Sequence, residues 1–361
     1  METIDTSLVQ ALQWLRYVLN PDTEAPVVSD WAAIYGFARK QALLGICAPQ
    51  VHQESIPQLI LFDWIRQLRR IEYHNNLINT RIGEVLGMLE QDGFACCLLK
   101  GQGNAVKYPD PLRRTPGDID IWVDASPEDV CRYVQSKFPE EKVSFKHIHF
   151  PIFSDVKVDV HVTPLKLYDR RSRKRLQRWI ELKKEEQFAH QVSLPGIERT
   201  VSVPTDAFNA VYQLGHMLIH LFDEGLGLRQ VVDYFYVLKS LSGDLKERSR
   251  IVAAIKDLGM LRFARAMMWV ESEVLGLPPS DCVVEPDGRL GKKILDDMME
   301  GGNFGHHTHR YKGRRGFFSR GTVNAGRIMR LFPVCPRESA AILLRKMGTV
   351  VRRAVRGRKK G

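Results

Sequence analysis

The sequence predicts an α+β protein in which a small sheet lies between N-terminal and C-terminal helical regions. Apolar residues recur at helical spacing in the first quarter of the chain and again in its second half. Between these parts, residues 94–165 alternate short apolar runs with turn residues, a pattern typical of strands and short helices. We expect four regions, namely a helical region at 1–92, the sheet at 93–168, a helical domain at 169–309 and a basic tail at 310–361.

The N-terminal region is expected to be helical from residue 5 to residue 91. A first helix is indicated by apolar residues that share one helix face, Leu8, Leu12, Leu15 and Val18. Ser29 is the predicted N-cap of the next helix, because a short polar side chain there can accept from a first-turn N–H. A long third helix is expected from Pro57 to about Gln91, and Asp92-Gly93 then signals a turn.

The sheet region is expected to begin with a buried strand, continue through a glycine turn and a short helix, and reach a strand with two acids. The predicted elements in order are a strand at 94–99, the Lys100-Gly101 turn, a strand from Asp118, a helix at 127–138, and strands at 146–153 and 156–162. Helices are expected again from Arg171 to about Asp297, including 205–222 and 228–240.

Three aspartates are the candidate catalytic residues. Alternate residues of a strand face the same side, so Asp118 and Asp120 are expected to project together while Ile119 packs inward. Asp159 lies on the polar face of a strand of alternating valines, and we expect that strand to be a neighbour in the same sheet. Three carboxylates facing one cleft suit two hard divalent cations, Mg²⁺ or Mn²⁺, that clamp a triphosphate and activate the attacking oxygen.

With these motifs the chain resembles the nucleotidyltransferase superfamily typified by DNA polymerase β, and more closely the bacterial nucleotidyltransferase family proteins of largely unknown substrate. The resemblance spans about residues 94–165, with a weaker similarity at 216–235. It implies a small mixed sheet of the nucleotidyltransferase type with flanking helices. The motifs that carry it are Leu99-Lys100-Gly101, Tyr108-Pro109, Arg114, Asp118-Ile119-Asp120 and Asp159-Val160-His161.

The resemblance also implies where a nucleotide and its acceptor bind. The superfamily usually has Gly-Gly or Gly-Ser in the turn, whereas this chain has Gly101-Gln102 or Gly103-Asn104, which lack the serine hydroxyl. A glycine backbone followed by a helix N-terminus still allows close approach of phosphate. The expected nucleotide-binding residues are Lys100, Gly101, Gln102, Gly103 and Arg114, and the expected acceptor-site residues are His161, His216, His220 and Arg229.

Several of these residues have alternative interpretations. His216 and His220 lie four apart on one helix face, so they suit zinc ligands, cleft-facing polar residues or satisfied core histidines. Arg229 suits a phosphate or a structural pair with an aspartate, and Arg114, like its neighbour Arg113, suits a phosphate or a counter-charge for the acids. The cluster at 306–309 contains three histidines, but its glycine-rich surroundings favour an exposed loop.

The basic character of the chain belongs to its C-terminal segment. Residues 310–361 carry 16 Lys or Arg and one acid, a net charge of +15, so residues 1–309 carry −4. Apolar residues recur at helical spacing within this segment, which predicts a basic amphipathic helix. Such a helix packs on the protein itself, lies on an anionic membrane or binds nucleic acid.

The sequence therefore predicts a metal-dependent nucleotidyltransferase that moves an NMP from an NTP, expected to be ATP, to an unidentified hydroxyl or phosphate acceptor. The alternative is a non-catalytic nucleotide-binding or regulatory module that docks to a membrane or polyanion through the basic segment. The chain contains no apolar stretch of transmembrane length and begins without a basic signal region, so a cytoplasmic protein, peripheral at the membrane if the tail binds lipid, is expected.

Overall fold

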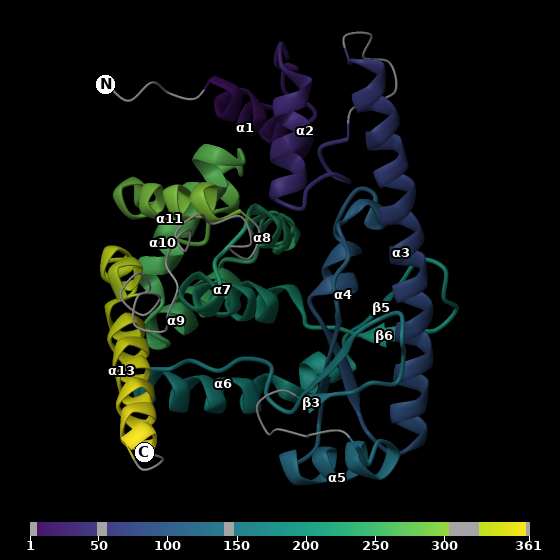
Figure 1. Ribbon diagram of the computed structural model, residues 1–361, viewed down its shortest axis with the longest axis vertical. Coiled ribbons are helices and arrows are strands. Elements are labelled where there is room, and N and C mark those ends of the chain that lie inside the picture. Colours follow the sequence, from purple (N-terminus) through teal and green to yellow (C-terminus); the bar gives the residue numbers. More distant parts are fainter. Residues whose placement is uncertain (1–5, 49–55, 141–147, 303–324, 359–361) are drawn as a thin grey trace. The chain divides into compact units, whose positions relative to one another are not determined.

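The computed structural model describes residues 6–48, 56–140, 148–302 and 325–358, and of residues 349–358 it describes only the helix (Figure 1). It confirms the α+β prediction: a small mixed sheet is formed by residues in the middle of the sequence, and helices come before and after it. The contacts divide the chain into two compact units. Unit 1 comprises Met1–Pro164, Leu182–Gln213 and Val232–Leu241, and unit 2 comprises Leu165–Glu181, Leu214–Val231 and Ser242–Gly361. The four-region division of the chain stays a prediction.

The N-terminal helices of unit 1 are α1 (Thr6–Leu19), α2 (Trp31–Lys40) and α3 (Gln58–Gln91). The prediction of Ser29 as the N-cap of α2 is wrong by one residue. The Asp30 carboxylate accepts from the backbone N–H of Ala33 at 2.8 Å, while the Ser29 hydroxyl bonds with the Gln10 side chain. A carboxylate next to a helix N-terminus also interacts favourably with the helix dipole, which favours the aspartate.

The main sheet has four strands in the order β1-β2-β4-β3. The strands are β1 (Cys96–Leu99), β2 (Ile119–Val123), β3 (Ile148–His149) and β4 (Val158–His161). The pairing of β2 with β4 is parallel and the other two pairings are antiparallel, so the sheet is mixed as expected. Between β1 and β2 lie α4 (Gly101–Ala105) and the short helix η1 (Pro111–Arg113), and α5 (Pro127–Lys137) follows β2.

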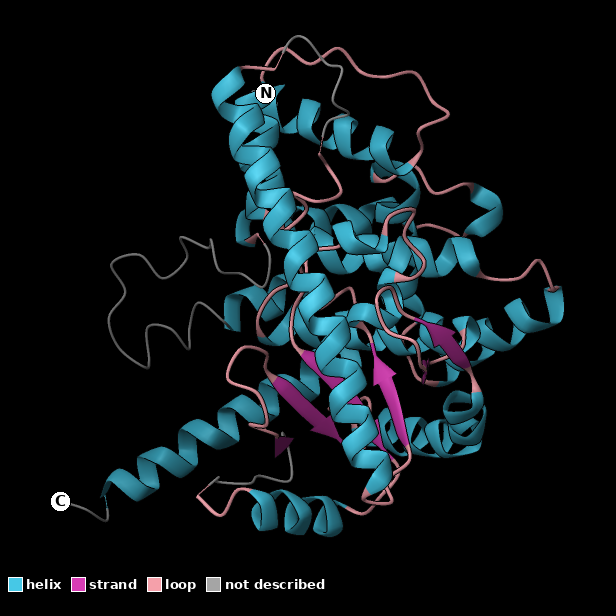
Figure 2. Cartoon of the chain, turned by 90° about the vertical axis from the view of Figure 1, so that its right-hand side faces the viewer, coloured by secondary structure: helices cyan, strands magenta, loops and turns pink. Residues whose placement is uncertain are grey.

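One face of this sheet packs on the main core of unit 1. Alternate strand residues such as Ile119, Ile121 and Val160 enter a cluster with apolar residues of α3 and α5. The long helix α3 accordingly runs beside the strands in both views (Figures 1 and 2). The strand period of two places the intervening residues on the opposite face. That opposite face carries Asp120 and Trp122.

The opposite face is covered by aromatic residues around the acid positions. The Trp122 ring lies 4.9 Å from the Phe188 ring and 5.9 Å from the Phe208 ring, measured between centroids. Phe188 belongs to α6 (Arg170–Ala189) and Phe208 to α7 (Asp206–Asp223). The buried Trp122 side chain therefore packs against α6 and α7 on this face of the sheet.

The described part of the second half of the chain is helical apart from a hairpin that periodicity did not predict. The hairpin is formed by β5 (Gln191–Ser193) and β6 (Thr200–Ser202), and β6 contributes Val201 to the core of unit 1. The further helices are α8 (Leu228–Ser240), α9 (Leu245–Asp257), α10 (Leu261–Trp269), η2 (Val270–Val274), η3 (Pro279–Asp281), α11 (Gly288–Gly301) and α13 (Pro336–Arg358).

The predicted basic helix is α13, and its first turns pack within unit 2. The buried Glu338 carboxylate accepts from the backbone N–H groups of Tyr168 and Asp169, just before α6, at 2.8 and 2.9 Å. Further along, Leu344 and Met347 are 69% and 63% exposed. The start of α13 is thus part of the core, whereas its middle presents apolar side chains outward. Within the described residues, no helix combines the length and apolar character needed to cross a bilayer.

Candidate active site

The parallel pairing of β2 with β4 brings two of the three predicted acids together. Asp120 is the register partner of Asp159, and neighbouring partners in paired strands project to the same face of the sheet. Both residues are buried, at 7% and 5% exposure. Asp118 directly precedes β2 and is exposed. The expectation that Asp159 belongs to a neighbouring strand and faces the same side as Asp120 is therefore confirmed.

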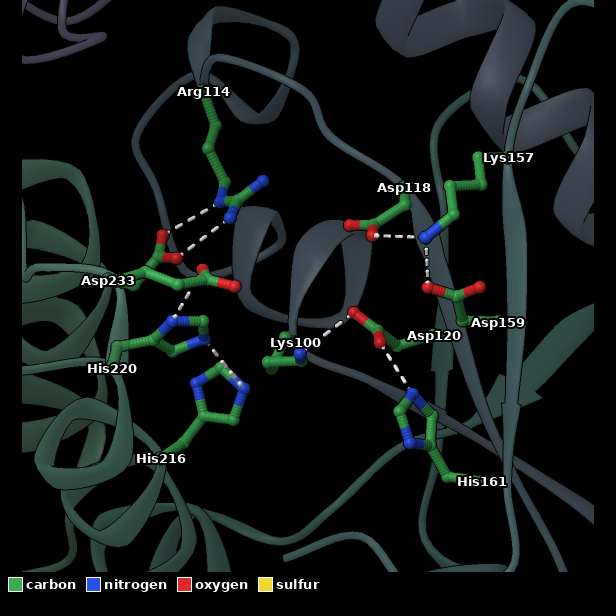
Figure 3. Close-up of polar contacts among 11 residues, drawn as sticks. Lys100, Arg114, Asp118, Asp120, Lys157, Asp159, His161, His216, His220 and Asp233 are labelled. Atoms are coloured by element: carbon green, nitrogen blue, oxygen red, sulfur yellow. Dashed lines mark hydrogen bonds and ion pairs between the residues drawn. The ribbon is translucent and has the colours of Figure 1, made fainter. Parts of the chain in front are cut away.

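A single lysine connects the third acid to this pair. The Lys157 ammonium forms an ion pair with Asp159 and lies 3.9 Å from a carboxylate oxygen of Asp118 (Figure 3). Partial burial lowers the pKa of Lys157, but the hydrogen bond to Asp159 and the charges of Asp159 and Asp118 raise it above its ordinary value. Lys157 therefore stays charged and holds the two carboxylates close to one another.

Asp120 is bound on both of its oxygens by cationic or polar nitrogen groups of unit 1. Lys100 Nζ lies 2.9 Å from Oδ2, and His161 Nε2 lies 2.7 Å from Oδ1 (Figure 3). Burial raises the pKa of Asp120, but the charge of Lys100 and the hydrogen bond from His161 hold it far below its ordinary value. Asp120 is therefore ionised, and His161, an expected acceptor-site residue, lies in direct contact with it.

The turn that carries Lys100 has an unusual backbone. Lys100 has φ 51° and ψ −143°, and the following Gly101 has φ 43°. A residue with a side chain rarely adopts a positive φ, and such strain costs about 1–3 kcal/mol, which surrounding structure must offset. Glycine adopts it readily, which explains Gly101. The strained turn directs the Lys100 ammonium to Asp120.

The other residues predicted to bind phosphate have structural partners. The Gln102 amide donates to Asn79 at 2.8 Å and to Asn75 at 3.2 Å, both on α3. Gly103 is buried, and a Cβ there would lie 3.2 Å from the Val203 side chain, so its missing side chain serves close packing. In this conformation the Gln102 side chain anchors α4 to α3, and the phosphate contacts expected for Lys100 and the turn stay predictions.

Arg114 does not point to the acids. Its guanidinium forks onto Asp233 of α8, with Nε and a terminal nitrogen 2.7 and 2.8 Å from the two carboxylate oxygens (Figure 3). The Tyr108 hydroxyl donates to the same carboxylate at 2.5 Å. All three residues are buried. The phosphate-binding role expected for Arg114 has no support in this geometry, because one edge of the guanidinium binds Asp233 and its remaining nitrogen, Nη1, donates to the Thr115 carbonyl at 3.3 Å. Its physical role is to fix the segment that leads to Asp118.

The remaining predicted residues lie in unit 2 or outside the described residues. His216 and His220 lie on the part of α7 that belongs to unit 2, with their Nε2 atoms 3.3 Å apart. Arg229 lies near the start of α8, also in unit 2. Their role at an acceptor site stays a prediction. The histidine cluster at 306–309 lies outside the described residues.

Sequence reasoning missed two features of this site. Lys157 was visible only as one polar residue of an alternating strand, yet it bridges two acids. Asp233 lies 119 residues from Arg114, and no local pattern connects the two. The sequence did indicate that charged residues are dense around the acid pair, since Arg114 and Asp118 are only four residues apart.

The three carboxylates are suitable ligands for a hard divalent cation, although in this structure they are paired with lysine and histidine side chains. Mg²⁺ prefers carboxylate oxygens, and Asp118, Asp120 and Asp159 supply them. Lys157 already places a positive charge between two of these groups, where a metal ion would act in the same way. In the part of the chain that the structure describes, no three His, Cys, Asp or Glu side chains are arranged to hold a metal ion directly. Metal binding here therefore requires Lys157 to move aside.

A comparison with family models matches residues 28–276 to a family described as "Uncharacterised nucleotidyltransferase". The match covers more than half of the chain and includes the whole of the acid site. Comparisons with curated proteins and with solved structures found no match.

Proposed function

Because the chain belongs to this family of uncharacterised nucleotidyltransferases, we propose that it moves a nucleoside monophosphate from a nucleoside triphosphate to a hydroxyl or phosphate acceptor. The acceptor oxygen would bond to the α-phosphorus, and the bond from that phosphorus to the β-phosphate oxygen would break, with release of pyrophosphate. The observation that carries the proposal is the register of Asp120 with Asp159, which places two buried carboxylates side by side. Asp118 adds a third through the shared Lys157. Clustered ionised carboxylates repel one another, so such a group is costly unless it holds cations.

Asp118, Asp120 and Asp159 would hold two Mg²⁺ or Mn²⁺ ions. When bound, such ions supply charge neutralisation for the triphosphate and lower the pKa of the attacking acceptor oxygen. Lys157 would release Asp118 and Asp159, since its ammonium competes for the same oxygens. This competition makes the affinity of Asp118 and Asp159 for divalent cations depend on Lys157.

The protein's own groups would position the phosphates and Asp120. Lys100 contacts Asp120 at 2.9 Å, and its flexible side chain allows the ammonium to turn to a phosphate oxygen. His161 would keep Asp120 in place after Lys100 turns away, because it binds the other carboxylate oxygen. The Asp159 carboxylate would accept the acceptor hydroxyl's proton once Lys157 has left it. We propose ATP as the nucleotide and the cytoplasm as the compartment.

The test is transfer of label from nucleoside triphosphates labelled at the α-phosphate, with Mg²⁺ or Mn²⁺, to components of a cell extract. Label at the γ-phosphate should be released and not transferred. Asp120→Asn and Asp159→Asn should each abolish transfer while the fold survives. Asp124→Asn is the matched control, because Asp124 follows the same strand, is exposed and pairs with Lys184. Full transfer by Asp120→Asn would refute the proposed chemistry.

A second candidate is a nucleotide-binding module without catalysis that docks to an anionic surface through α13. The exposure of Leu344 and Met347 between basic residues of α13 favours it. Each basic residue near an anionic membrane contributes on the order of 1 kcal/mol and is screened by salt. Salt-sensitive binding to anionic vesicles without any transfer of label would support this candidate over the enzyme.

A further inference from the structure

The end of α7 carries two imidazoles in contact. His216 and His220 lie four residues apart, a spacing that places both on one helix face. Their Nε2 atoms are 3.3 Å apart and their ring centroids 4.3 Å apart (Figure 3). Both side chains are only partly buried. The two ring nitrogens thus lie within reach of one bound ion, and neither side chain is fully buried.

A carboxylate holds the other side of one ring. His220 Nδ1 lies 3.3 Å from a carboxylate oxygen of Glu224, one turn further along the chain. A carboxylate beside Nδ1 favours the tautomer with its proton on that nitrogen, which leaves the lone pair on Nε2. The His220 lone pair then points to His216. Histidines that bind metals through one nitrogen usually donate the other N–H in this way.

The distance between the two nitrogens matches that of two ligands on one metal ion. At Zn–N bonds of about 2.0–2.1 Å and a tetrahedral angle, two bound nitrogens lie about 3.3 Å apart. We propose that His216 and His220 bind a first-row transition metal ion, in the first place Zn²⁺, through their Nε2 atoms. Glu224 orients His220 for this purpose.

This site differs in chemistry from the carboxylate site. Imidazole suits Zn²⁺, Ni²⁺ and Cu²⁺, whereas carboxylate oxygens suit Mg²⁺. Within the described residues no third His, Cys, Asp or Glu side chain joins the pair. With two protein ligands, a tetrahedral metal ion would keep two positions for water or a ligand, one more than in zinc sites that act on substrates. The competing interpretation is a metal-free N–H···N hydrogen bond between the two rings.

The first experiment measures metal binding by the full chain. The histidines at 306, 307 and 309 are replaced by Ala beforehand, because they also have metal-binding side chains. The protein is dialysed against Zn²⁺ with excess Mg²⁺ to saturate the carboxylates, and bound zinc is counted. Cu²⁺ in place of Zn²⁺ should give an electron paramagnetic resonance spectrum with coupling to two imidazole nitrogens. That measurement needs no change in α7, so it does not depend on how an α7 variant folds.

The second experiment removes the ligands in the same background. His216→Ala and His220→Ala should each lose one equivalent of bound Zn²⁺. Glu224→Gln should retain the stoichiometry but bind about 10–100-fold more weakly, as expected for an orienting partner. His190→Ala is the control, since that ring bonds to the Val203 carbonyl and not to another histidine. It should bind Zn²⁺ like the parent.

The outcomes separate the proposal from its alternatives. Absence of a bound equivalent in the parent, or a copper spectrum without two nitrogens, would leave a hydrogen-bonded pair and overturn the metal site. Retention of the equivalent by both His216→Ala and His220→Ala would overturn it as well. Asp120→Asn should still bind this Zn²⁺, because the site uses no residue of the acid cluster. Loss of nucleotidyl transfer therefore leaves this proposal untouched.

Discussion

Breaking the buried pair of Arg114 and Asp233 should be among the most destabilising changes in unit 1. The two side chains are only 5% and 7% exposed, and they share two hydrogen bonds of 2.7 and 2.8 Å. Burial of Arg114 opposes its charge, but the charge of Asp233 and its hydrogen bonds raise the pKa of the guanidinium above its ordinary value. A guanidinium is so strongly basic that it keeps its proton in proteins, so Arg114 stays charged also when Asp233 loses its charge.

The expected loss of stability follows from leaving the Arg114 charge unpaired. Asp233→Asn preserves shape but removes the counter-charge, and loss of one partner of a buried ion pair costs about 3–5 kcal/mol. For a unit of some 150–250 residues, each kcal/mol shifts Tm by about 2–4 °C, so a loss on the order of 10 °C is expected. The Tyr108 hydroxyl also loses its charged acceptor, which adds to the cost.

The assay is thermal and urea unfolding followed by circular dichroism. The control is Lys184→Met, which breaks an exposed pair with Asp124 and should cost no more than about 1 kcal/mol. The double variant Arg114→Met/Asp233→Leu should recover part of the loss, because apolar residues can replace a buried pair, while the Tyr108 hydroxyl still lacks its acceptor. If Asp233→Asn lowers the free energy of unfolding by no more than Lys184→Met does, then Arg114 is not held by Asp233. The prediction that Arg114 binds a phosphate would then stand again.

Three further predictions concern single side chains. Lys157→Met should raise the affinity for Mg²⁺ by roughly fivefold in a calorimetric titration, because each partly exposed ion pair that it removes is worth about 0–1 kcal/mol; unchanged affinity would show that the lysine does not compete. Glu271 is fully buried in η2 and its carboxylate has no hydrogen-bond partner among the described residues, so burial raises its pKa well above 4.5. The folded state then binds this proton more tightly than the unfolded chain, so its contribution to stability is lost as pH rises above about 4.5, the ordinary pKa of the carboxyl group, and Glu271→Gln should flatten the fall in urea midpoint over that range; an equal slope in both proteins would contradict the assignment. Glu338→Ala should lower the stability of unit 2 by about 1–3 kcal/mol, because two partly buried backbone N–H groups before α6 lose their charged acceptor; a change within the error of urea unfolding would show that α13 does not stabilise that unit.

Local periodicity was sufficient to locate the sheet and its acids. The alternation of apolar and polar residues around Asp120 and Asp159 determines which strand face each carboxylate occupies, since successive side chains point to opposite sides. The same reasoning located α3, α7 and α8 to within a residue or two of their observed bounds. The β5–β6 hairpin escaped it, because its strands are only three residues long and carry too few alternations to be recognised.

The partners of the charged side chains were decided by the tertiary structure alone. Whether Arg114 meets a phosphate or an aspartate depends on where the chain returns 119 residues later, and no local pattern encodes that path. From the sequence, Gln102 was expected in a turn that contacts a ligand. In the structure, its side-chain amide instead donates to two asparagines of α3. Likewise, Lys157 bridges two acids only because β2 and β4 pair in parallel at one register. Periodicity determines the face on which a side chain lies, whereas its partner depends on long-range packing that brings distant segments within hydrogen-bond distance.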